Sequence, residues 1–332
     1  MMKANNFELR AALDDLLRMH DANLGRMVRL DSSPCPDRTS FNLIDIEVEL
    51  EDGNVCQVLL KDLGVKDLHD TARRVKPSFL YNPMREISTY RVILAPIRLG
   101  TAHCYGAVVR PDDDQYWLFL EKVSGLRLSQ VRDYSAWLES ARWLAHLHCR
   151  FAEQGDYLTR LAPLVRYDAA FYRLWLERAL KFQSFKLPKV VWETLIGNYE
   201  RAVERLILLP STLIHGEFYA SNILVQETSE RFRICPVDWE TAAVGPGLID
   251  LAALSSGTWS ERERTEMAGV YSDTLASVGT PALPLHDLLS ALDDCRLHLA
   301  IRWLGWAADW SPPIENVHDW LAEAIALSEK MH

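Results

Sequence analysis

The chain has 332 residues, of which 48% are apolar and 25% are charged, and its formal net charge is −10. This composition is typical of a globular protein, and a chain of this length is expected to form two lobes or domains. The negative charge disfavours nucleic acid as a partner, and the absence of an apolar run of 18 residues disfavours a membrane protein.

The N-terminal segment carries acidic residues throughout, so an amphipathic helix over 7–22 is expected rather than a signal peptide. The six cysteines are scattered singly, without a Cys-x-x-Cys pair. We therefore expect free thiols in a reducing cytoplasm, and neither a disulfide framework nor a zinc site.

Alternating apolar and polar residues predict a sheet in the first third of the chain. Strands are expected at 26–30, 41–50, 55–64, 105–110 and 115–123, with an Asp-Gly turn between the second and third. A loop rich in turn-forming residues is expected at 31–40, and a helix is expected at 84–93.

The pattern becomes helical after residue 122. A helix is expected over 135–155, with Gly155 at its C-terminal end. Two more helices at 167–182 and 188–208, a strand pair after residue 221, and helices to the C-terminus complete the prediction. The sequence thus indicates an α+β protein, with an antiparallel-sheet lobe at 1–122 and a larger, mainly helical lobe at 123–332.

Four polar residues lie beside apolar, strand-like segments. Glu217 and Asn222 belong to "HGEFYASN", and Asp238 and Glu240 belong to "VDWE". A loop followed by a hairpin can bring these side chains together. Oxygens from Asn222 and Asp238, completed by phosphate oxygens, form a donor set that suits Mg²⁺. A third carboxylate nearby, from Glu217, could orient and deprotonate a hydroxyl group.

These motifs resemble those of the aminoglycoside phosphotransferase/choline kinase family, which has a two-lobed protein-kinase-like fold. The family's catalytic loop reads His-Gly-Asp-x-x-x-x-Asn, and its metal segment reads Asp-x-Glu/Asp. The resemblance implies that Glu217 is the catalytic carboxylate, and that Asn222 and Asp238 bind Mg²⁺ with help from Glu240. "GPGLIDLAAL" also resembles the family, and implies that Asp250 caps and supports a helix beneath the site.

Upstream residues extend the resemblance to nearly the whole chain. It implies that Lys61, on the third strand, contacts the phosphates of ATP or GTP, and that Glu86, on the next helix, holds its ammonium group. It also implies that backbone groups of Glu121 and Val123 meet the adenine edge. His148 is expected to be a packed, structural histidine.

Two features depart from the family pattern. The loop at 31–40 contains no glycine and offers only hydroxyl side chains and backbone amides to phosphate. Glu217 replaces the usual aspartate, and a misplacement of about 1 Å can cost roughly 100-fold in rate. Either the cavity is built for glutamate, or catalysis is lost and a binding module remains. The other motif residues are retained, so we favour activity.

The acceptor site is expected in the helical lobe. Trp303, Trp306 and Trp310 follow helical spacing and could stack on a sugar or hold a cationic group, with Asp309 nearby. The alternative is that these tryptophans are core residues. Residues 281–332 contain eight acidic and three basic residues, which would favour a cationic acceptor if the acids face a cleft. Otherwise they form a solvated helical face.

The sequence therefore predicts a small-molecule kinase. It would transfer the γ-phosphoryl group of ATP or GTP to a hydroxyl of an aminoglycoside-like, amino-alcohol or sugar acceptor. The alternative is a catalytically inactive pseudokinase that binds nucleotide or another ligand. A hydrolase has little support, because no Gly-x-Ser-x-Gly motif is present.

Overall fold

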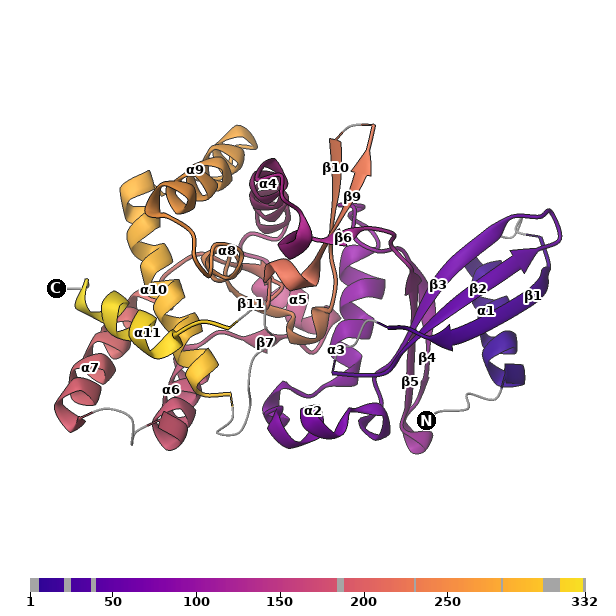
Figure 1. Cartoon of the computed structure of the whole chain (residues 1–332), viewed down its shortest axis with the longest axis horizontal. Helices are drawn as coiled ribbons and strands as arrows, with labels where there is room; N and C mark the ends of the chain where they lie inside the picture. The colour runs from indigo at the N-terminus through magenta and orange to yellow at the C-terminus, as the bar shows by residue number, and fades with distance from the viewer. Residues whose placement is uncertain are drawn as a thin grey trace.

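The computed structural model describes residues 6–20, 25–36, 40–183, 188–229, 231–281, 283–306 and 317–330. The N-terminal part is built on a five-stranded antiparallel sheet and the C-terminal part is mainly helical. The predicted α+β class is therefore confirmed. The two parts lie next to each other along the long axis of the molecule (Figure 1).

The N-terminal sheet has the strand order β1-β2-β3-β5-β4. Its strands are β1 (Met27–Pro34), β2 (Leu43–Leu50), β3 (Val55–Asp62), β4 (Cys104–Arg110) and β5 (Gln115–Glu121). Helix α1 (Asn6–His20) buries Leu9, Leu13 and Leu17 against one face of this sheet. These residues recur every four positions, so they lie on one side of the helix.

Helix α3 (Pro83–Ser88) belongs to the other side of the sheet and carries Glu86. The Asn82 side chain accepts a hydrogen bond from the Met84 amide at 3.0 Å, and Pro83 occupies the first helical position, two features that start helices. The helix continues as a π-helical segment, Thr89–Leu94. The predicted helix is present, with this wider turn at its C-terminal end.

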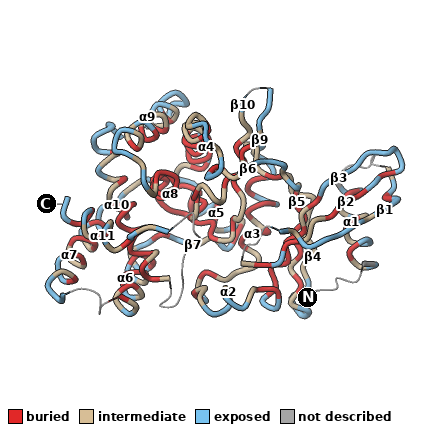
Figure 2. Tube along the Cα trace, viewed as in Figure 1, coloured by how far each residue is buried: buried red, intermediate tan, exposed pale blue. Residues whose placement is uncertain are grey.

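The C-terminal part surrounds a central short helix, α8 (Leu248–Leu254), in which every residue is buried. The burial colours of Figure 2 show α8 as a mainly buried segment among partly exposed helices. The other helices are α4 (Ser135–Arg150), α5 (Gly155–Leu161), α6 (Ala169–Gln183), α7 (Lys189–Leu206), α9 (Glu261–Ser277), α10 (Leu285–Leu304) and α11 (Trp320–Glu329).

Two small sheets complete this part. Their strand orders are β10-β9-β6 and β7-β11-β8. The strands are β6 (Leu126–Arg127), β7 (Val165–Arg166), β8 (Ser211–Ile214), β9 (Ile223–Thr228), β10 (Arg231–Pro236) and β11 (Ala243–Pro246). No helix among the described residues is long and apolar enough to cross a membrane.

Two local predictions are corrected. The segment expected to be a loop from residue 31 is a strand as far as Pro34, because Asp31, Ser32 and Ser33 pair with β2 at the sheet edge. Gly155 does not end a helix but begins α5. The left-handed turn is made by Glu153, at φ 58°, whose amide donates to the Ser211 carbonyl at 2.9 Å.

Candidate active site

The loop 215–222 follows β8 and is fastened from below by α8. The Asp250 carboxylate accepts hydrogen bonds from the His215 amide at 2.6 Å and the Gly216 amide at 2.9 Å. Gly216 has φ 82°, and a Cβ there would lie 2.6 Å from the Thr241 carbonyl oxygen, so only glycine fits. Asp250 is thus the predicted structural acceptor, but it lies inside α8 and is not its N-cap, which is Gly247.

Glu217 projects from this loop toward Arg302 of α10. Its Oε1 accepts a hydrogen bond from Arg302 Nη2 at 2.6 Å. Burial raises the pKa of Glu217 to about 7; Arg302 opposes the rise, whereas the Glu240 and Asp238 carboxylates add to it. A carboxylate with this pKa can both accept and hold a proton near neutral pH.

Sequence reasoning missed Arg302. Its guanidinium also donates to the Gly216 carbonyl, and to the Tyr167 hydroxyl at 3.2 Å. Its side chain is 3% exposed, so it fixes both the backbone and the carboxylate of the loop from inside the protein. Arg302 and Glu217 are 85 positions apart in the chain, so no local sequence pattern predicts their contact.

Lys61, Glu86 and Asp238 form a buried cluster between β3, α3 and the segment after β10. Lys61 Nζ lies 2.7 Å from Glu86 Oε2 and 2.5 Å from Asp238 Oδ1. Burial alone would lower the pKa of Lys61, but the Asp238 and Glu86 carboxylates raise it above its ordinary value. The expected Lys61–Glu86 ion pair is present, and the lysine also neutralises a predicted metal ligand.

Asp238 has φ 68° and ψ 59°, in the left-handed region. A non-glycine residue there costs about 1–3 kcal/mol and persists only where its surroundings hold it. Here the Trp239 amide donates to Glu86 Oε1 at 3.2 Å, and Lys61 holds the Asp238 carboxylate. The strained backbone turns the carboxylate toward the cavity described below.

Asn222 is placed beside this segment by backbone pairing. Its carbonyl accepts from the Val237 amide at 2.9 Å, and its side-chain nitrogen donates to the Glu217 carbonyl at 3.0 Å. The side-chain amide of Asn222 is therefore oriented by the loop 215–222. Its nitrogen makes the contact with Glu217, so its Oδ1 oxygen is not used there.

Glu240 is engaged by two residues of the N-terminal part. Its carboxylate pairs with Lys76 and accepts a hydrogen bond from the Ser40 hydroxyl at 3.2 Å. Lys76 follows helix α2 (Asp70–Val75) and was not singled out by the sequence. Its side chain is 5% exposed.

These residues line one cavity of about 790 Å³. Its wall contains every described residue predicted to contact nucleotide, metal or acceptor, namely Lys61, Glu86, Glu121, Val123, Glu217, Asn222, Asp238, Glu240, Trp303 and Trp306. The wall also includes Lys76 and Arg302. Sequence positions separated by more than 200 residues thus meet at one concave surface.

The predicted nucleotide edge has one available backbone donor. The Glu121 amide donates to the His103 carbonyl at 2.7 Å, and its carboxylate pairs with Arg233. Within the described part of the chain, the Val123 amide makes no hydrogen bond. The Glu121 amide already donates to another residue, so of these two amides only that of Val123 is available to a nucleotide base.

Trp303 and Trp306 line the cavity while packing against core tryptophans. Trp303 stacks on Trp320 with ring centroids 5.2 Å apart, and Trp306 stacks on Trp175 at 5.8 Å. The packing expected of core residues is therefore present, and contact with an acceptor stays a prediction. Helix α10 ends at Leu304, so Trp306 lies beyond it and the expected continuous helical face is wrong there. The remaining two candidates, Asp309 and Trp310, lie outside the described residues.

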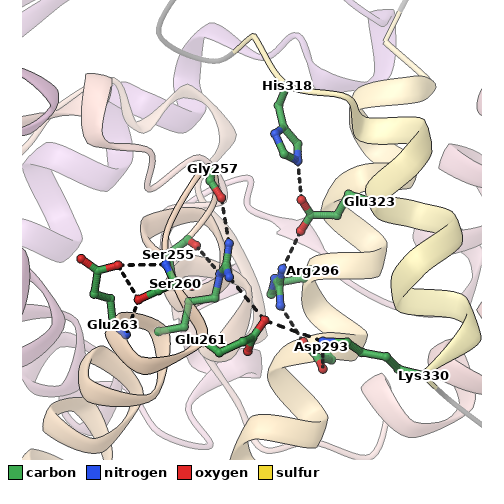
Figure 3. Close-up of polar contacts among 11 residues, drawn as sticks. Ser255, Gly257, Ser260, Glu261, Glu263, Asp293, Arg296, His318, Glu323 and Lys330 are labelled. Atoms are coloured by element: carbon green, nitrogen blue, oxygen red, sulfur yellow. Dashed lines mark hydrogen bonds and ion pairs between the residues drawn. The ribbon is translucent and has the colours of Figure 1, made fainter.

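A network of ion pairs fixes α11, which carries Trp320, to α10. Arg296 pairs with Glu323 and with Asp293, both at 2.8 Å, and Glu323 also contacts His318 (Figure 3). The side chain of Arg296 is 8% exposed, so these contacts are shielded from solvent. By holding α11, the network supports Trp320, which stacks on the cavity residue Trp303.

The acidic residues of the C-terminal segment do not line the cavity where the structure describes them. Asp294 pairs with Arg205, Asp293 and Glu323 pair with Arg296, and Asp319 accepts from the Ala322 amide at the start of α11. The described acids of this segment therefore give no support to a cationic acceptor, and two others, Asp309 and Glu315, lie outside the described residues.

No cluster of three or more His, Cys, Asp or Glu side chains within the described ranges is arranged to hold a metal alone. Asn222, Asp238 and Glu240 still offer hard amide and carboxylate oxygens to one cavity. Such a donor set suits Mg²⁺ when substrate phosphates supply the remaining ligands. Lys61 pairs with the Asp238 carboxylate and Lys76 pairs with the Glu240 carboxylate.

Comparison with known proteins places this site in a family. A family model described as the phosphotransferase enzyme family matches residues 94–296, which is more than half of the chain. The chain therefore belongs to this family of phosphotransferases. Among curated protein sequences, none matches significantly.

Solved structures show the same fold over nearly the whole chain. A choline kinase from Cryptosporidium parvum Iowa II has a TM-score of 0.59 at 16% identity, covering 98% of this chain and 94% of its own. A GDP complex of aminoglycoside 2′-phosphotransferase-IIIa has a TM-score of 0.59 at 12% identity, covering 97% and 98%. A macrolide 2′-phosphotransferase from Brachybacterium faecium has a TM-score of 0.55 at 18% identity, covering 95% and 97%. The kinase-like fold is confirmed.

Proposed function

We propose that the protein transfers the γ-phosphoryl group of ATP or GTP to a hydroxyl group of a small-molecule acceptor. The observation that carries this proposal is the single cavity, which collects the predicted phosphate-binding, metal-binding and catalytic side chains from both parts of the chain. Phosphoryl transfer depends mainly on positioning and charge stabilisation, which such a preformed set provides.

Glu217 orients the acceptor hydroxyl and takes its proton. Oε1 is held by Arg302, whereas Oε2 makes no hydrogen bond among the described residues. The extra methylene of glutamate is thus matched by a partner on α10, which supports the reading that the cavity is built for this residue. Aspartate would reach less far toward the guanidinium.

Lys61, held by Glu86, binds nucleotide phosphates, and the Val123 amide faces the base. Asn222 and Asp238, with Glu240, would hold Mg²⁺, which when bound neutralises charge on the phosphates. The GDP complex among the similar structures is consistent with a nucleoside phosphate in this fold.

The acceptor binds beside Trp303 and Trp306, next to Glu217. The two tryptophans offer aromatic surface to the acceptor, which suits a sugar-like or other hydroxylated ring. Some of the similar proteins are a choline kinase and aminoglycoside and macrolide phosphotransferases. A cytoplasmic location is supported by six free cysteines.

The test is phosphoryl transfer by purified protein with Mg²⁺, ATP or GTP, and a panel of amino alcohols, sugars, aminoglycosides and macrolides. Phosphorylated product is detected by mass spectrometry. Glu217→Gln should lower kcat by about 100-fold or more because the proton acceptor is lost. Glu217→Asp should lower kcat by a similar factor, because the carboxylate is displaced by about 1 Å.

Glu227→Gln is the matched control, because Glu227 is an exposed residue of β9 outside the cavity and should behave as wild type. If nucleotide binds but no acceptor is phosphorylated, and Glu217→Gln changes nothing, the protein is a nucleotide-binding module and the proposal fails.

A further inference from the structure

Lys76 is a buried cation in the wall of the cavity. It follows α2, and its amide donates to the Ala72 carbonyl at 2.8 Å, which closes the last turn of that helix. Its side chain is 5% exposed and its ammonium group pairs with the Glu240 carboxylate. Burying an ammonium group is costly unless a carboxylate compensates it, so this position is built around the charge.

Lys76 and Lys61 share one aromatic neighbour. Lys76 Nζ lies 5.2 Å from the centroid of the Phe41 ring, and Lys61 Nζ lies 5.7 Å from the same centroid. Both ammonium groups therefore contact the same ring, and both lysines line the same cavity. Each is paired with one carboxylate of the short segment 238–240.

The loop between β1 and β2 differs in sequence from a glycine-rich phosphate loop. The chain between β1 and β2 contains no glycine. A triphosphate brings several negative charges that must be matched by cations or amide donors. A second lysine in the same cavity as Lys61 can supply charge that a glycine-rich loop would otherwise supply through its amides.

We propose that Lys76 is a second phosphate-binding cation of the nucleotide site, held on Glu240 until a nucleoside triphosphate binds. This rests on the function proposed above. When the triphosphate enters, the ammonium group moves from Glu240 to a terminal phosphate oxygen, and Glu240 becomes available as a cation ligand. No covalent bond changes in this exchange of ion pairs.

The exchange differs from a purely structural role for the ion pair. A structural pair between Lys76 and Glu240 would affect the stability of the protein, but it would not distinguish ligands by their phosphates. Loss of a phosphate-binding lysine must instead weaken triphosphate binding selectively, because adenosine has no charge for the lysine to contact.

The experiment measures equilibrium binding of ATP, GTP and adenosine by calorimetry, in Mg²⁺ and in EDTA, for wild type, Lys76→Met and Lys76→Arg. Lys76→Met should weaken binding of the preferred triphosphate by about 10- to 100-fold, the range for losing a charged hydrogen bond. Adenosine binding should change less than threefold. Lys76→Arg should restore most of the affinity, because the charge returns.

Lys66→Met is the matched control. Lys66 is an exposed lysine ten residues earlier whose ammonium group donates to the Asp113 carbonyl at 2.6 Å, outside the cavity. It should bind all three ligands as wild type does. Equal affinity of wild type and Lys76→Met for the triphosphate, or an equal loss for triphosphate and adenosine, overturns the inference alone. A wild-type protein that binds neither triphosphate overturns the proposed function as well.

Discussion

Glu217 and Arg302 define the site at the scale of single residues. The carboxylate and guanidinium meet at 2.6 Å inside the protein, and the same arginine holds the Gly216 carbonyl and the Tyr167 hydroxyl. A carboxylate that is pinned by one oxygen has a defined direction for the other. This geometry fits the length of a glutamate side chain at this position.

The pKa of Glu217 predicts how activity depends on pH. Burial raises this pKa to about 7, and only the deprotonated carboxylate can take a proton from the acceptor. We therefore expect kcat/KM for the acceptor to rise with pH and to level off above about 7, because this quantity reports the enzyme before the acceptor binds. The profile is measured from pH 5.5 to 9 with saturating Mg²⁺–nucleotide.

The residual activity of Glu217→Gln should lack this rise, and an unchanged profile in that variant would assign the titration to another group. The sign for stability is opposite. The folded protein holds the Glu217 proton more tightly than the unfolded chain does. Its contribution to stability therefore falls as pH rises from about 4.5 to about 7.

At the scale of elements, α8 supports the loop 215–222 from below. Its Asp250 carboxylate accepts two loop amides, and His148 of α4 lies 3.4 Å away and also contacts the Tyr271 hydroxyl of α9 at 2.9 Å. One fully buried carboxylate therefore links the loop to three helices. The expected structural role of His148 is consistent with these contacts.

Asp250→Asn should destabilise the protein by about 2–4 kcal/mol, because the amide cannot accept both loop N–H groups as a carboxylate does and leaves a buried donor unpaired. The free energy of unfolding is measured in urea. Asp273→Asn on the exposed side of α9 is the control and should change it by less than about 0.5 kcal/mol. A loss at Asp250 no larger than at Asp273 would contradict this role.

At the scale of the whole molecule, the two parts share a core. One apolar cluster extends from Ile87 and Tyr90 of α3 and its π-helical extension, through Leu120 of β5, to Leu327 of α11. Arg85 of α3 adds polar links, donating to the Pro163 carbonyl and the Glu240 carbonyl, both at 2.9 Å. The N-terminal and C-terminal walls of the cavity are therefore held in a fixed arrangement.

Arg85→Met should lower the free energy of unfolding by about 2–4 kcal/mol, because the buried Leu80 carbonyl and the part-buried Pro163 and Glu240 carbonyls lose their donor. It should also weaken the coupling of the two parts, so that urea unfolding followed by tryptophan fluorescence becomes broader. Arg91→Met, at an exposed position of the same helical segment, serves as the control. If both variants unfold alike, Arg85 does not join the two parts.

Local patterns in the sequence predicted the helices and strands well where one face is buried. The alternation of apolar and polar residues in β2 and the four-residue spacing of leucines in α1 follow directly from burial of one face. These patterns can therefore be recognised without knowledge of the fold. The errors fall where tertiary contacts override local preference. Ser32 and Ser33 favour a turn but pair with a neighbouring strand. Gly155 begins a helix, because the chain turns at Glu153, which adopts the left-handed conformation.

The sequence by itself determined the fold class and, through motifs resembling a known family, the order of Lys61, Glu86, Glu217 and Asp238 along the chain. Only the tertiary structure decided which cations meet those carboxylates. Arg302 is 85 positions from Glu217 and Lys76 is 164 positions from Glu240, and neither spacing has a periodicity that could reveal it. Contacts between distant segments depend on how the helices and sheets pack, and a linear pattern records only the neighbours within one element.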